Sequence, residues 1–495
     1  SRGSGSPTSS RGSGSPTRSR GSGSPTSKLA ALAAEIVAVR RKAPPEREGR
    51  GRPGVPSRRR YPSVVPRTYW VETLGCPKNQ VDSDKLVGTL TADGMVAADS
   101  PDDADLVVVN TCAFVEEARE ESVATILALD ERRGGTSRLV VTGCMAERYG
   151  DELADALPEA DAVSGFGVPV SLVPKPARRS GPVVADEAVP TLDLLNLPRP
   201  RSERPWAYVK VAEGCDKACG FCAIPSFRGP QRSRSVDAVL AEVDGLDVRE
   251  VVLVAQDLAA YGRDRSGPGA GGERAIVPLV RALSERVERV RLLYLYPSEL
   301  TDELIELMAR GPVPYFDLSL QHVSPPLVRR MRRWGDGATF LRRIDQIRAL
   351  RPDAAFRSNF IVGYPGETEE DHDVLLDFVQ QAQLDWCGFF SYSPEDGTYA
   401  AGLDGAVAPA LVADRLAELR ELQDGITAAR RDALIGTDLL VLVDEPGVGR
   451  SHREAPEIDG VVEVPAHLAV GELHRVRVTA AAGPDLTAVP VEVRP

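Results

Sequence analysis

The chain has 495 residues, of which 42% are hydrophobic and 27% are charged, a balance that is ordinary for a globular protein of about three domains. The formal net charge is −12; residues 1–60 hold 14 basic and 3 acidic residues, a net of +11, which leaves −23 on the rest. So acidic a body argues against broad non-specific binding to nucleic acid, and no apolar run approaches the ~18–20 residues of a membrane span.

The chain opens on a repeated nine-residue unit that is rich in Gly, Ser and Pro. Such a composition cannot bury a core, so we expect residues 1–66 to be a disordered low-complexity extension. The Arg- and Ser-rich, acid-poor leader also resembles an organelle transit peptide, which remains an alternative. Seven cysteines, an odd number in a long chain, favour a reducing compartment, and we expect a cytoplasmic protein.

Ordered structure is expected to begin near Thr68, with apolar strands that alternate with helices. Predicted strands cover 68–76, 104–112 and 138–144, and predicted helices cover 79–93, 114–133 and 146–157, the first capped near Asn79. Continuous apolar strands between helices indicate a parallel sheet. We therefore expect an open α/β domain over residues 67–178, followed by a linker over 179–204.

Each of the three predicted strands of this domain ends at a cysteine: Cys76, Cys112 and Cys144. In open parallel sheets the carboxyl ends of the strands form the ligand-binding edge, so these three thiols can converge. The alternative is three unrelated buried cysteines, since a free cysteine packs like a small hydrophobic residue. Repetition at the same place in three βα units favours a metal site.

A second βα series is expected over residues 205–433. Six candidate strands lie at 207–214, 251–257, 291–296, 315–321, 356–363 and 387–393, with helices between them and a long charged helix at 409–433. Six units in this length predict an incomplete (βα)6 barrel, because a closed eight-unit barrel takes ~250 residues. Cys387 lies in the last apolar strand and is expected to pack in the core.

The first strand of this barrel leads into three cysteines spaced C-x3-C-x2-C, Cys215, Cys219 and Cys222. Three thiolates in one loop can hold a soft metal centre and leave one position open for a substrate or cofactor. The alternative is a zinc knuckle that lacks one ligand, yet no further Cys or His occurs between Cys144 and His322. An iron–sulfur cluster of the 4Fe-4S type with one open iron is the favoured interpretation.

Residues 434–495 contain short Val-rich segments between Gly and Pro, which predict a small β-barrel. Residues 436–495 carry 10 acidic and 5 basic residues. A domain that grips tRNA needs a basic face, so this charge favours a basic protein as partner. A solvated acidic surface with no partner is the alternative.

The cysteine loop resembles that of the radical S-adenosylmethionine (SAM) superfamily, whose fold is the partial barrel. The resemblance implies that Cys215, Cys219 and Cys222 are catalytic cluster ligands and that SAM binds the open iron as the radical source. Phe221 matches the aromatic residue before the last cysteine, and residues 360–367 resemble the strand end that supports adenine. The implied cofactor-binding residues are Phe221, Gly363, Gly366, Arg357, Ser358 and Gln256.

The order of the domains resembles the radical SAM methylthiotransferases, with a TRAM-like last barrel. In that family a second 4Fe-4S cluster on the N-terminal triad carries the sulfur that is inserted, and another SAM donates the methyl group. The segments 74–79, 212–229, 255–257 and 320–325 resemble the RimO-type branch, which modifies the β-carbon of an aspartate in small-subunit ribosomal protein twelve. The branch that modifies adenosine in tRNA is the alternative.

The resemblance implies a basic ribosomal protein as substrate and an electron donor such as flavodoxin or ferredoxin; the sulfur donor remains open, and no membrane partner is expected. A hypothesis of another class is a non-catalytic metal-binding protein on the ribosome. The iron and sulfide content distinguishes that hypothesis from a radical enzyme.

Overall fold

The computed structural model describes residues 67–135, 137–171, 193–265 and 275–491. The extension expected over residues 1–66 and the first part of the expected linker, residues 179–192, lie outside the described residues.

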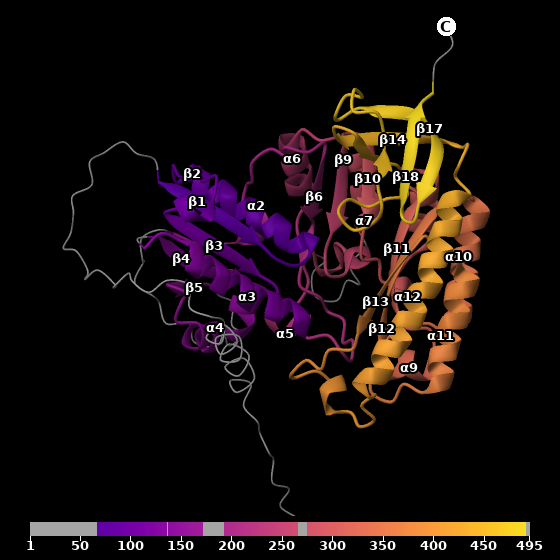
Figure 1. Ribbon diagram of the computed structural model, residues 1–495, viewed down its shortest axis with the longest axis horizontal. Helices are drawn as coiled ribbons and strands as arrows, with labels where there is room; N and C mark the ends of the chain where they lie inside the picture. Colours follow the sequence, from indigo (N-terminus) through magenta and orange to yellow (C-terminus); the bar gives the residue numbers. More distant parts are fainter. Residues whose placement is uncertain (1–66, 136, 172–192, 266–274, 492–495) are drawn as a thin grey trace, which may run out of the picture. The chain divides into compact units, whose positions relative to one another are not determined.

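The N-terminal part of the described chain is a five-stranded parallel sheet in the order β2-β1-β3-β4-β5 (Figure 1). Its strands are β1 (Thr68–Thr73), β2 (Val96–Ala97), β3 (Leu106–Thr111), β4 (Arg138–Gly143) and β5 (Ala162–Val163). Its helices are α2 (Pro77–Ala92), α3 (Glu116–Arg132) and α4 (Cys144–Ala156). The central strand β3 is buried along its whole length, as its apolar run predicts.

The start of α2 differs from the prediction of a cap near Asn79. The helix begins at Pro77, with Cys76 in the capping position. Proline suits the first helical position because its missing N–H has no partner there in any helix. The Asn79 side chain instead donates hydrogen bonds to the carbonyls of Leu74 and Thr111, at 2.9 and 3.0 Å, and joins two strand ends.

The central domain is an open barrel of six parallel strands, as predicted. Three-stranded sheets in the orders β6-β9-β10 and β11-β12-β13 are joined by one bridge between Leu295 and Leu318. The strands are β6 (Trp206–Lys210), β9 (Glu250–Val254), β10 (Arg289–Leu292), β11 (Tyr315–Gln321), β12 (Ala355–Val362) and β13 (Trp386–Ser391). A short antiparallel pair, β7 (Ala212–Glu213) with β8 (Arg232–Ser233), follows β6.

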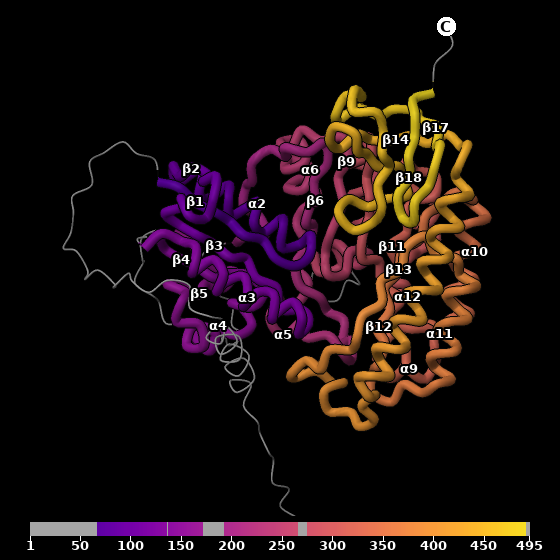
Figure 2. Tube along the Cα trace, in the orientation of Figure 1, coloured from indigo at the N-terminus to yellow at the C-terminus, as the bar shows by residue number. Residues whose placement is uncertain are grey.

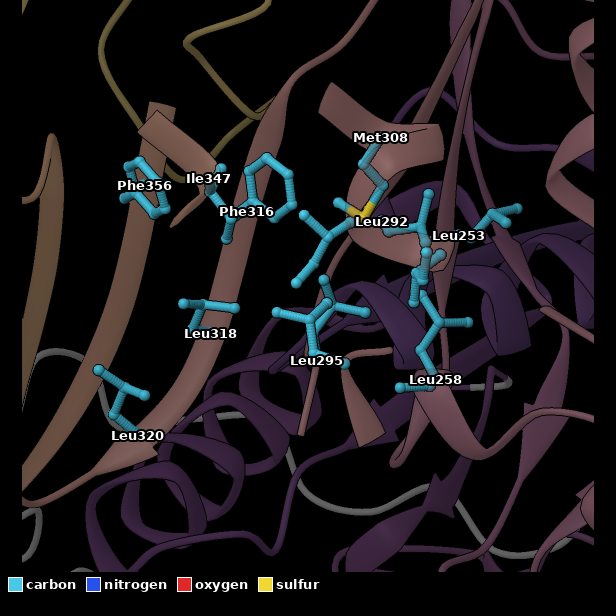
Figure 3. Close-up of a cluster of buried hydrophobic side chains, with 14 of the residues drawn as sticks. Leu253, Leu258, Leu292, Leu295, Met308, Phe316, Leu318, Leu320, Ile347 and Phe356 are labelled. Carbon is cyan, nitrogen blue, oxygen red and sulfur yellow. The ribbon is translucent and has the colours of Figure 1, made fainter. Parts of the chain in front are cut away.

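Helices cover the outer face of this barrel. They are α6 (Val236–Leu246), α7 (Ile276–Ser284), α8 (Asp302–Arg310), α9 (Pro325–Arg330), α10 (Gly337–Leu350), α11 (Glu369–Ala382) and α12 (Pro409–Asp432), whereas the short α5 (Ile224–Arg228) packs against α4 of the N-terminal domain. In Figure 2, α12 runs beside α11 and β13. Figure 3 shows Phe316, Leu318 and Leu320, alternate residues of β11, in the buried cluster that these helices close.

The alternation of side chains along the strands gives the barrel a second, inner face. Tyr208, Val252, Leu293 and Tyr315 form a separate buried cluster there, together with Ala455 from the C-terminal part of the chain. On β12, Phe356 and Phe360 therefore pack under the helices, whereas their neighbours in sequence face the interior.

The C-terminal domain is a closed barrel in the order β14-β15-β16-β18-β17, which confirms the predicted small β-barrel. Its strands are β14 (Asp438–Glu445), β15 (Val448–Arg450), β16 (Val462–Glu463), β17 (Leu473–Ala482) and β18 (Asp485–Pro490). The loop between β15 and β16 packs onto the starts of the central strands: Tyr315 donates to Asp459 at 2.6 Å, and Arg291 donates to the carbonyl of His452 at 2.9 Å.

Some of the acidic side chains of this domain form ion pairs with arginines of the protein. Asp459 forms an ion pair with Arg357, Glu454 with Arg431, and Asp444 with Arg450. Two of these arginines lie outside residues 436–495, so the exposed surface is less acidic than the sequence sum. The argument from charge for a basic partner is correspondingly weaker.

Within the described ranges, no helix has both the length and the apolar character needed to cross a membrane.

Candidate functional site

The cysteines predicted at the strand ends of the N-terminal sheet lie at one edge of it. Cys76 follows β1 and caps α2, Cys112 follows β3 directly, and Cys144 is the first residue of α4 after β4. Because the three strands are parallel, these positions share the carboxyl edge of the sheet, where ligands bind in such folds.

Two glycines bring the thiol-bearing turns close to the neighbouring strand. Gly75 and Gly143 precede Cys76 and Cys144 and have φ values of +92° and +93°. A Cβ atom on Gly75 would lie 2.9 Å from the sulfur of Cys112, and one on Gly143 would lie 2.6 Å from the backbone nitrogen of Thr111. Glycine is required there for both the backbone conformation and the close approach.

Side chains from two domains meet at these thiols. Arg228, the last residue of α5, donates hydrogen bonds of 2.9 Å to the sulfur of Cys144 and to the Asn79 side-chain oxygen. Arg228 also lies 4.2 Å over the Phe166 ring. A cation held on a cysteine sulfur favours the thiolate that binds metal.

The three thiols differ in pKa because their neighbours differ. Burial raises the pKa of Cys76, but the charges of Lys78 and Arg228 outweigh it and lower that pKa below its usual value. Burial and the nearby Cys76 and Cys144 raise the pKa of Cys112 to about 12. Burial also raises the pKa of Cys144, against the charge of Arg228. The sulfurs are thus electrostatic neighbours, which three unrelated buried cysteines would not be.

The loop with Cys215, Cys219 and Cys222 is closed at its base by the pairing of β7 with β8. The Cys215 amide donates to the carbonyl of Gly229 at 3.1 Å, and the Lys217 amide approaches the Cys215 sulfur at 3.4 Å. Burial raises the pKa of Cys215 to about 11 and that of Cys222 to about 12. Cys215, Cys219 and Cys222 are each other's electrostatic neighbours as well.

The far side of this loop packs on the segments that follow β11, β12 and β13. The Gly220 amide donates to the Met331 carbonyl at 2.8 Å, and its carbonyl accepts from the Ala400 amide at 2.7 Å. Phe221 packs against the buried cluster that contains Met331 and Tyr364. This contact brings the predicted Phe221 and the Gly-Tyr-Pro-Gly turn together.

An arginine also lies on a sulfur of this loop. Arg333 donates to the Cys219 sulfur at 3.2 Å and lies 4.2 Å over the Tyr296 ring. Lys217 lies over the same ring at 4.6 Å and forms an ion pair with Glu299 at 2.6 Å. Two cations, Arg333 and Lys217, therefore lie at this loop, which favours the thiolate form of its cysteines.

The two thiol sets border one short segment of the barrel, Tyr294–Tyr296, which follows β10. Burial and the nearby Cys76 raise the pKa of Tyr294; burial also raises the pKa of Tyr296, and the nearby Cys219 adds to that rise. Tyr294 has a φ of +64°, a conformation that is rare outside glycine and typical of functional sites. Both thiol sets are thus electrostatic neighbours of this one segment.

Buried ion pairs join the N-terminal and central domains around this place. Lys210 and Arg228 from the central domain both pair with Asp82 of α2 and with Glu213 of β7, and all four side chains are nearly or fully buried. Gln256, which was predicted to bind cofactor, donates to Glu213 at 2.9 Å, while its own oxygen is buried without a partner in the described chain.

The remaining predicted cofactor residues lie on β12 and the turn after it. Gly363 and Gly366 have φ values of +81° and +86°, but a Cβ on either would meet a protein side chain, Val412 at 2.5 Å and Arg330 at 2.9 Å. At both glycines, the space that a side chain would occupy is therefore taken by protein atoms.

Arg357 and Ser358 point to opposite faces of β12. Arg357 faces the interior and pairs with Asp459 at 3.3 Å. Ser358 is fully buried and donates to the Leu318 carbonyl at 2.8 Å, on the face that packs under the helices. Asn359 is the interior neighbour, and its side-chain oxygen is buried without a partner among the described residues.

Several residues of the site escaped the sequence analysis: Arg228, Arg333, Lys78, Tyr294 and Tyr296. Arg228 lies six residues after the cysteine loop, within a stretch already compared with the family, yet nothing local reveals that it reaches another domain. Arg333 lies in a basic run that reads as a solvated surface. These roles depend on long-range contacts.

Among the described residues, no three Cys, His, Asp or Glu side chains already stand as a complete set of metal ligands. The donor chemistry nevertheless fits an iron–sulfur cluster at each set: three thiols, each set with an arginine on one of its sulfurs.

Family models match three parts of the chain. The uncharacterized protein family UPF0004 matches residues 68–165, the radical SAM superfamily residues 209–379, and the TRAM domain residues 435–491. The central match assigns SAM and an iron–sulfur cluster to this chain as cofactors.

Curated relatives match nearly the whole chain. A protein of Moorella thermoacetica named ribosomal protein uS12 methylthiotransferase RimO is 46% identical over 80% of this chain and 92% of its own length. A protein of the same name from Kineococcus radiotolerans is 42% identical over 87% and 98%. Among solved structures, the radical SAM methyltransferase TsrM of Kitasatospora setae aligns over 82% of this chain and 84% of its own, with 14% identity and a TM-score of 0.43.

These relatives indicate a methylthiotransferase that uses radical SAM chemistry, as the resemblance of the sequence implied. An adenosine of tRNA is not the favoured substrate. The chain belongs to the RimO family of radical SAM methylthiotransferases.

Proposed function

We propose that this chain transfers a methylthio group to the β-carbon of an aspartate in ribosomal protein uS12. One observation carries the proposal: two sets of three thiols border the same segment, Tyr294–Tyr296, each set with an arginine on a sulfur. A reaction that joins a sulfur to a carbon radical needs its two centres near one another.

We assign a 4Fe-4S cluster to each set of thiols. Cys215, Cys219 and Cys222 would hold one cluster, which would supply a binding site for SAM and the electron for its cleavage. Cys76, Cys112 and Cys144 would hold the second cluster, which would supply the site for the sulfur to be transferred. A second SAM molecule is the methyl donor.

Side chains around the two sets orient and shield these groups. Arg228 and Arg333 donate to the sulfurs of Cys144 and Cys219. The residues proposed on the SAM side are Phe221, Gln256, Arg357, Gly363 and Gly366. Ser358 would act there only indirectly, since its hydroxyl holds β12 to β11 through Leu318.

The proposed partner is uS12, and the expected electron donor is a small redox protein such as flavodoxin or ferredoxin. These partners imply action in the cytoplasm, where ribosomes are assembled. Burial of part of the C-terminal acidic charge leaves the TRAM-like barrel as one contributor to substrate binding among others.

The test uses the anaerobically reconstituted chain with SAM, a reductant and either uS12 or anticodon-stem RNA, and measures the mass of each product. We expect the methylthio increment on uS12. An increment on the RNA alone would transfer the chain to the tRNA branch, and zinc without iron would make it a non-catalytic binding protein.

Cys387 supplies the matched control for the metal sites. Alanine at Cys76, Cys112 and Cys144 together, or at Cys215, Cys219 and Cys222 together, should lower the iron from about eight to about four per chain. Cys387→Ala should retain about eight, because this thiol packs against the apolar core. Loss of all iron in either triple variant would contradict two independent clusters.

A further inference from the structure

The ammonium of Lys78 has an unusual position between the two thiol sets. Lys78 is 9% exposed, and its nitrogen lies 3.6 Å from the centroid of the Tyr294 ring. Within the described parts of the chain this ammonium has no hydrogen bond or ion pair. A buried cation without an anion in contact is costly, so a binding role for it is worth testing.

Other cations around the site are already engaged with protein acceptors. Arg228 holds Glu213, Asp82 and the Cys144 sulfur; Lys210 holds the same two carboxylates. Lys217 pairs with Glu299, Arg333 donates to Cys219 and to the Ser319 carbonyl, and Arg357 pairs with Asp459. Of these described cations, Lys78 is the one whose polar head is free to accept an incoming anion.

Lys78 lies on the side of the site that carries Cys76, Cys112 and Cys144, where the transferred sulfur is proposed to bind (the sulfur side). It follows Cys76 by two residues, at the start of α2. The Tyr294 ring under its nitrogen belongs to the barrel, where the Tyr294 amide donates to the Asp317 carboxylate of β11 at 2.9 Å. Lys78 thus reaches from α2 to the mouth of the barrel.

SAM, by contrast, belongs on the side of Cys215–Cys222, which has its own cations, Lys217 and Arg333, around Tyr296. The carbon of the substrate that receives the sulfur must lie between the two sets of thiols. The functional group bonded to that carbon must then lie next to the sulfur side. For an aspartate that group is a carboxylate, which can enter a buried mouth only if a cation compensates its charge.

We infer that Lys78 binds the side-chain carboxylate of the target aspartate and thereby selects an acidic residue as substrate. This inference rests on the proposed function and adds a determinant of substrate specificity to it. Lys78 supplies a hydrogen bond and a compensating charge at the sulfur side, and Tyr294 holds the ammonium until the carboxylate arrives.

The test is a binding cycle with the holoprotein, SAM and no reductant, so that no turnover occurs. Mass fragmentation of the wild-type product first locates the modified aspartate of uS12. Fluorescence anisotropy then gives the Kd of uS12 and of uS12 with that aspartate changed to Asn, for wild type, Lys78→Met and Lys78→Arg.

Wild type should bind the aspartate form about 10-fold or more tightly than the Asn form, as expected for a charged hydrogen bond. Lys78→Met should bind both forms equally, and Lys78→Arg should restore the preference. The Kd for SAM should be the same in all three proteins. Iron content and the thermal midpoint identify any variant that fails to fold, and Lys78→Arg then carries the comparison.

A preference for aspartate that survives in Lys78→Met overturns the inference, and so does a weaker Kd for SAM together with an unchanged preference. Failure of the proposed function gives a different result: wild-type protein with two clusters then leaves uS12 unmodified under reducing conditions.

Discussion

Arg228 of the central domain donates a hydrogen bond of 2.9 Å to the sulfur of Cys144 in the N-terminal domain. The same guanidinium pairs with Asp82 and Glu213, so it serves one thiol and two carboxylates at a single buried point. Arg228 therefore contributes both to the packing of the two domains and to the charge around Cys76, Cys112 and Cys144. A change at this residue should affect stability and metal chemistry together.

Replacing Arg228 by Met should lower the free energy of unfolding by about 3–5 kcal/mol, because it leaves two buried carboxylates that only Lys210 compensates. Anaerobic denaturant titration measures this loss. Arg232→Met is the control, since its exposed ion pair with Asp193 should contribute at most about 1 kcal/mol. Equal losses in the two variants would rule out the role of the buried network.

Arg228→Lys should retain much of this stability but lose the hydrogen bond to the Cys144 sulfur. Hydrogen bonds to cluster sulfurs raise a reduction potential, so the potential of the cluster at Cys76, Cys112 and Cys144 should become more negative. An EPR-monitored redox titration measures it, and the cluster at Cys215, Cys219 and Cys222 is the internal reference. A shift of the reference alone would contradict the assignment.

Gly143→Ala should destroy the N-terminal metal site while Gly94→Ala should spare it. Both glycines have positive φ, at +93° and +81°, so both variants incur the cost of a strained backbone, about 1–3 kcal/mol. Only the Cβ at 143 also collides, 2.6 Å from the Thr111 nitrogen and 2.3 Å from the Asn110 side chain; at 94 nothing lies within 4 Å.

Iron analysis separates these two glycine variants. Gly143→Ala should contain about four irons per chain, because the displaced Cys144 can no longer join its triad, and Gly94→Ala about eight. If Gly143→Ala kept a full complement, the close approach before Cys144 would not matter for the site.

The sequence predicted the fold class and the convergence of Cys76, Cys112 and Cys144 because both depend on local patterns. Apolar strands that end in cysteine need only the rule that parallel strands share a carboxyl edge. The contacts of Arg228 with Cys144, 84 residues away, and of Tyr294 with Lys78 join different domains, and no local pattern encodes them.

Ser358 illustrates a finer limit. A strand places neighbouring residues on opposite faces, but which face is interior depends on where the helices pack. The sequence analysis placed both Arg357 and Ser358 at the SAM site, whereas Arg357 and Asn359 are the residues that face the barrel interior. The alternation of side chains along β12 could be predicted from the sequence. Which set of alternating residues faces inward could not, because it depends on the packing of Phe356 and Phe360 under α10 and α11.

This phase leads to a prediction for SAM binding. Asn359→Ala should raise the Kd for SAM by about 3–10-fold, the value of one hydrogen bond, because the Asn359 oxygen is buried and unpartnered within the described chain. Ser358→Ala should leave that Kd unchanged and lower the free energy of unfolding by about 1 kcal/mol, since its hydroxyl bonds Leu318. The reverse pattern in equilibrium dialysis would return Ser358 to the site.

The last prediction concerns pH and His322, which follows β11 and is fully buried. Burial, with His372 and Arg415 nearby and only Asp371 opposing, lowers the pKa of His322 from 6.5 to about 4. The neutral ring accepts a hydrogen bond from the Ser324 amide at 3.1 Å. Between pH 6.5 and 4 the unfolded chain therefore binds a proton that the folded chain refuses.

By linkage, this histidine costs the folded state up to about 3 kcal/mol as the pH falls through that window, and nothing above it. His322→Gln removes the titrating group, so its stability should fall less steeply between pH 6.5 and 4. Denaturant unfolding at several pH values measures the slopes, with His467→Gln, at an exposed position, as the control. If the two variants have the same slope as wild type, His322 is not kept neutral by its burial.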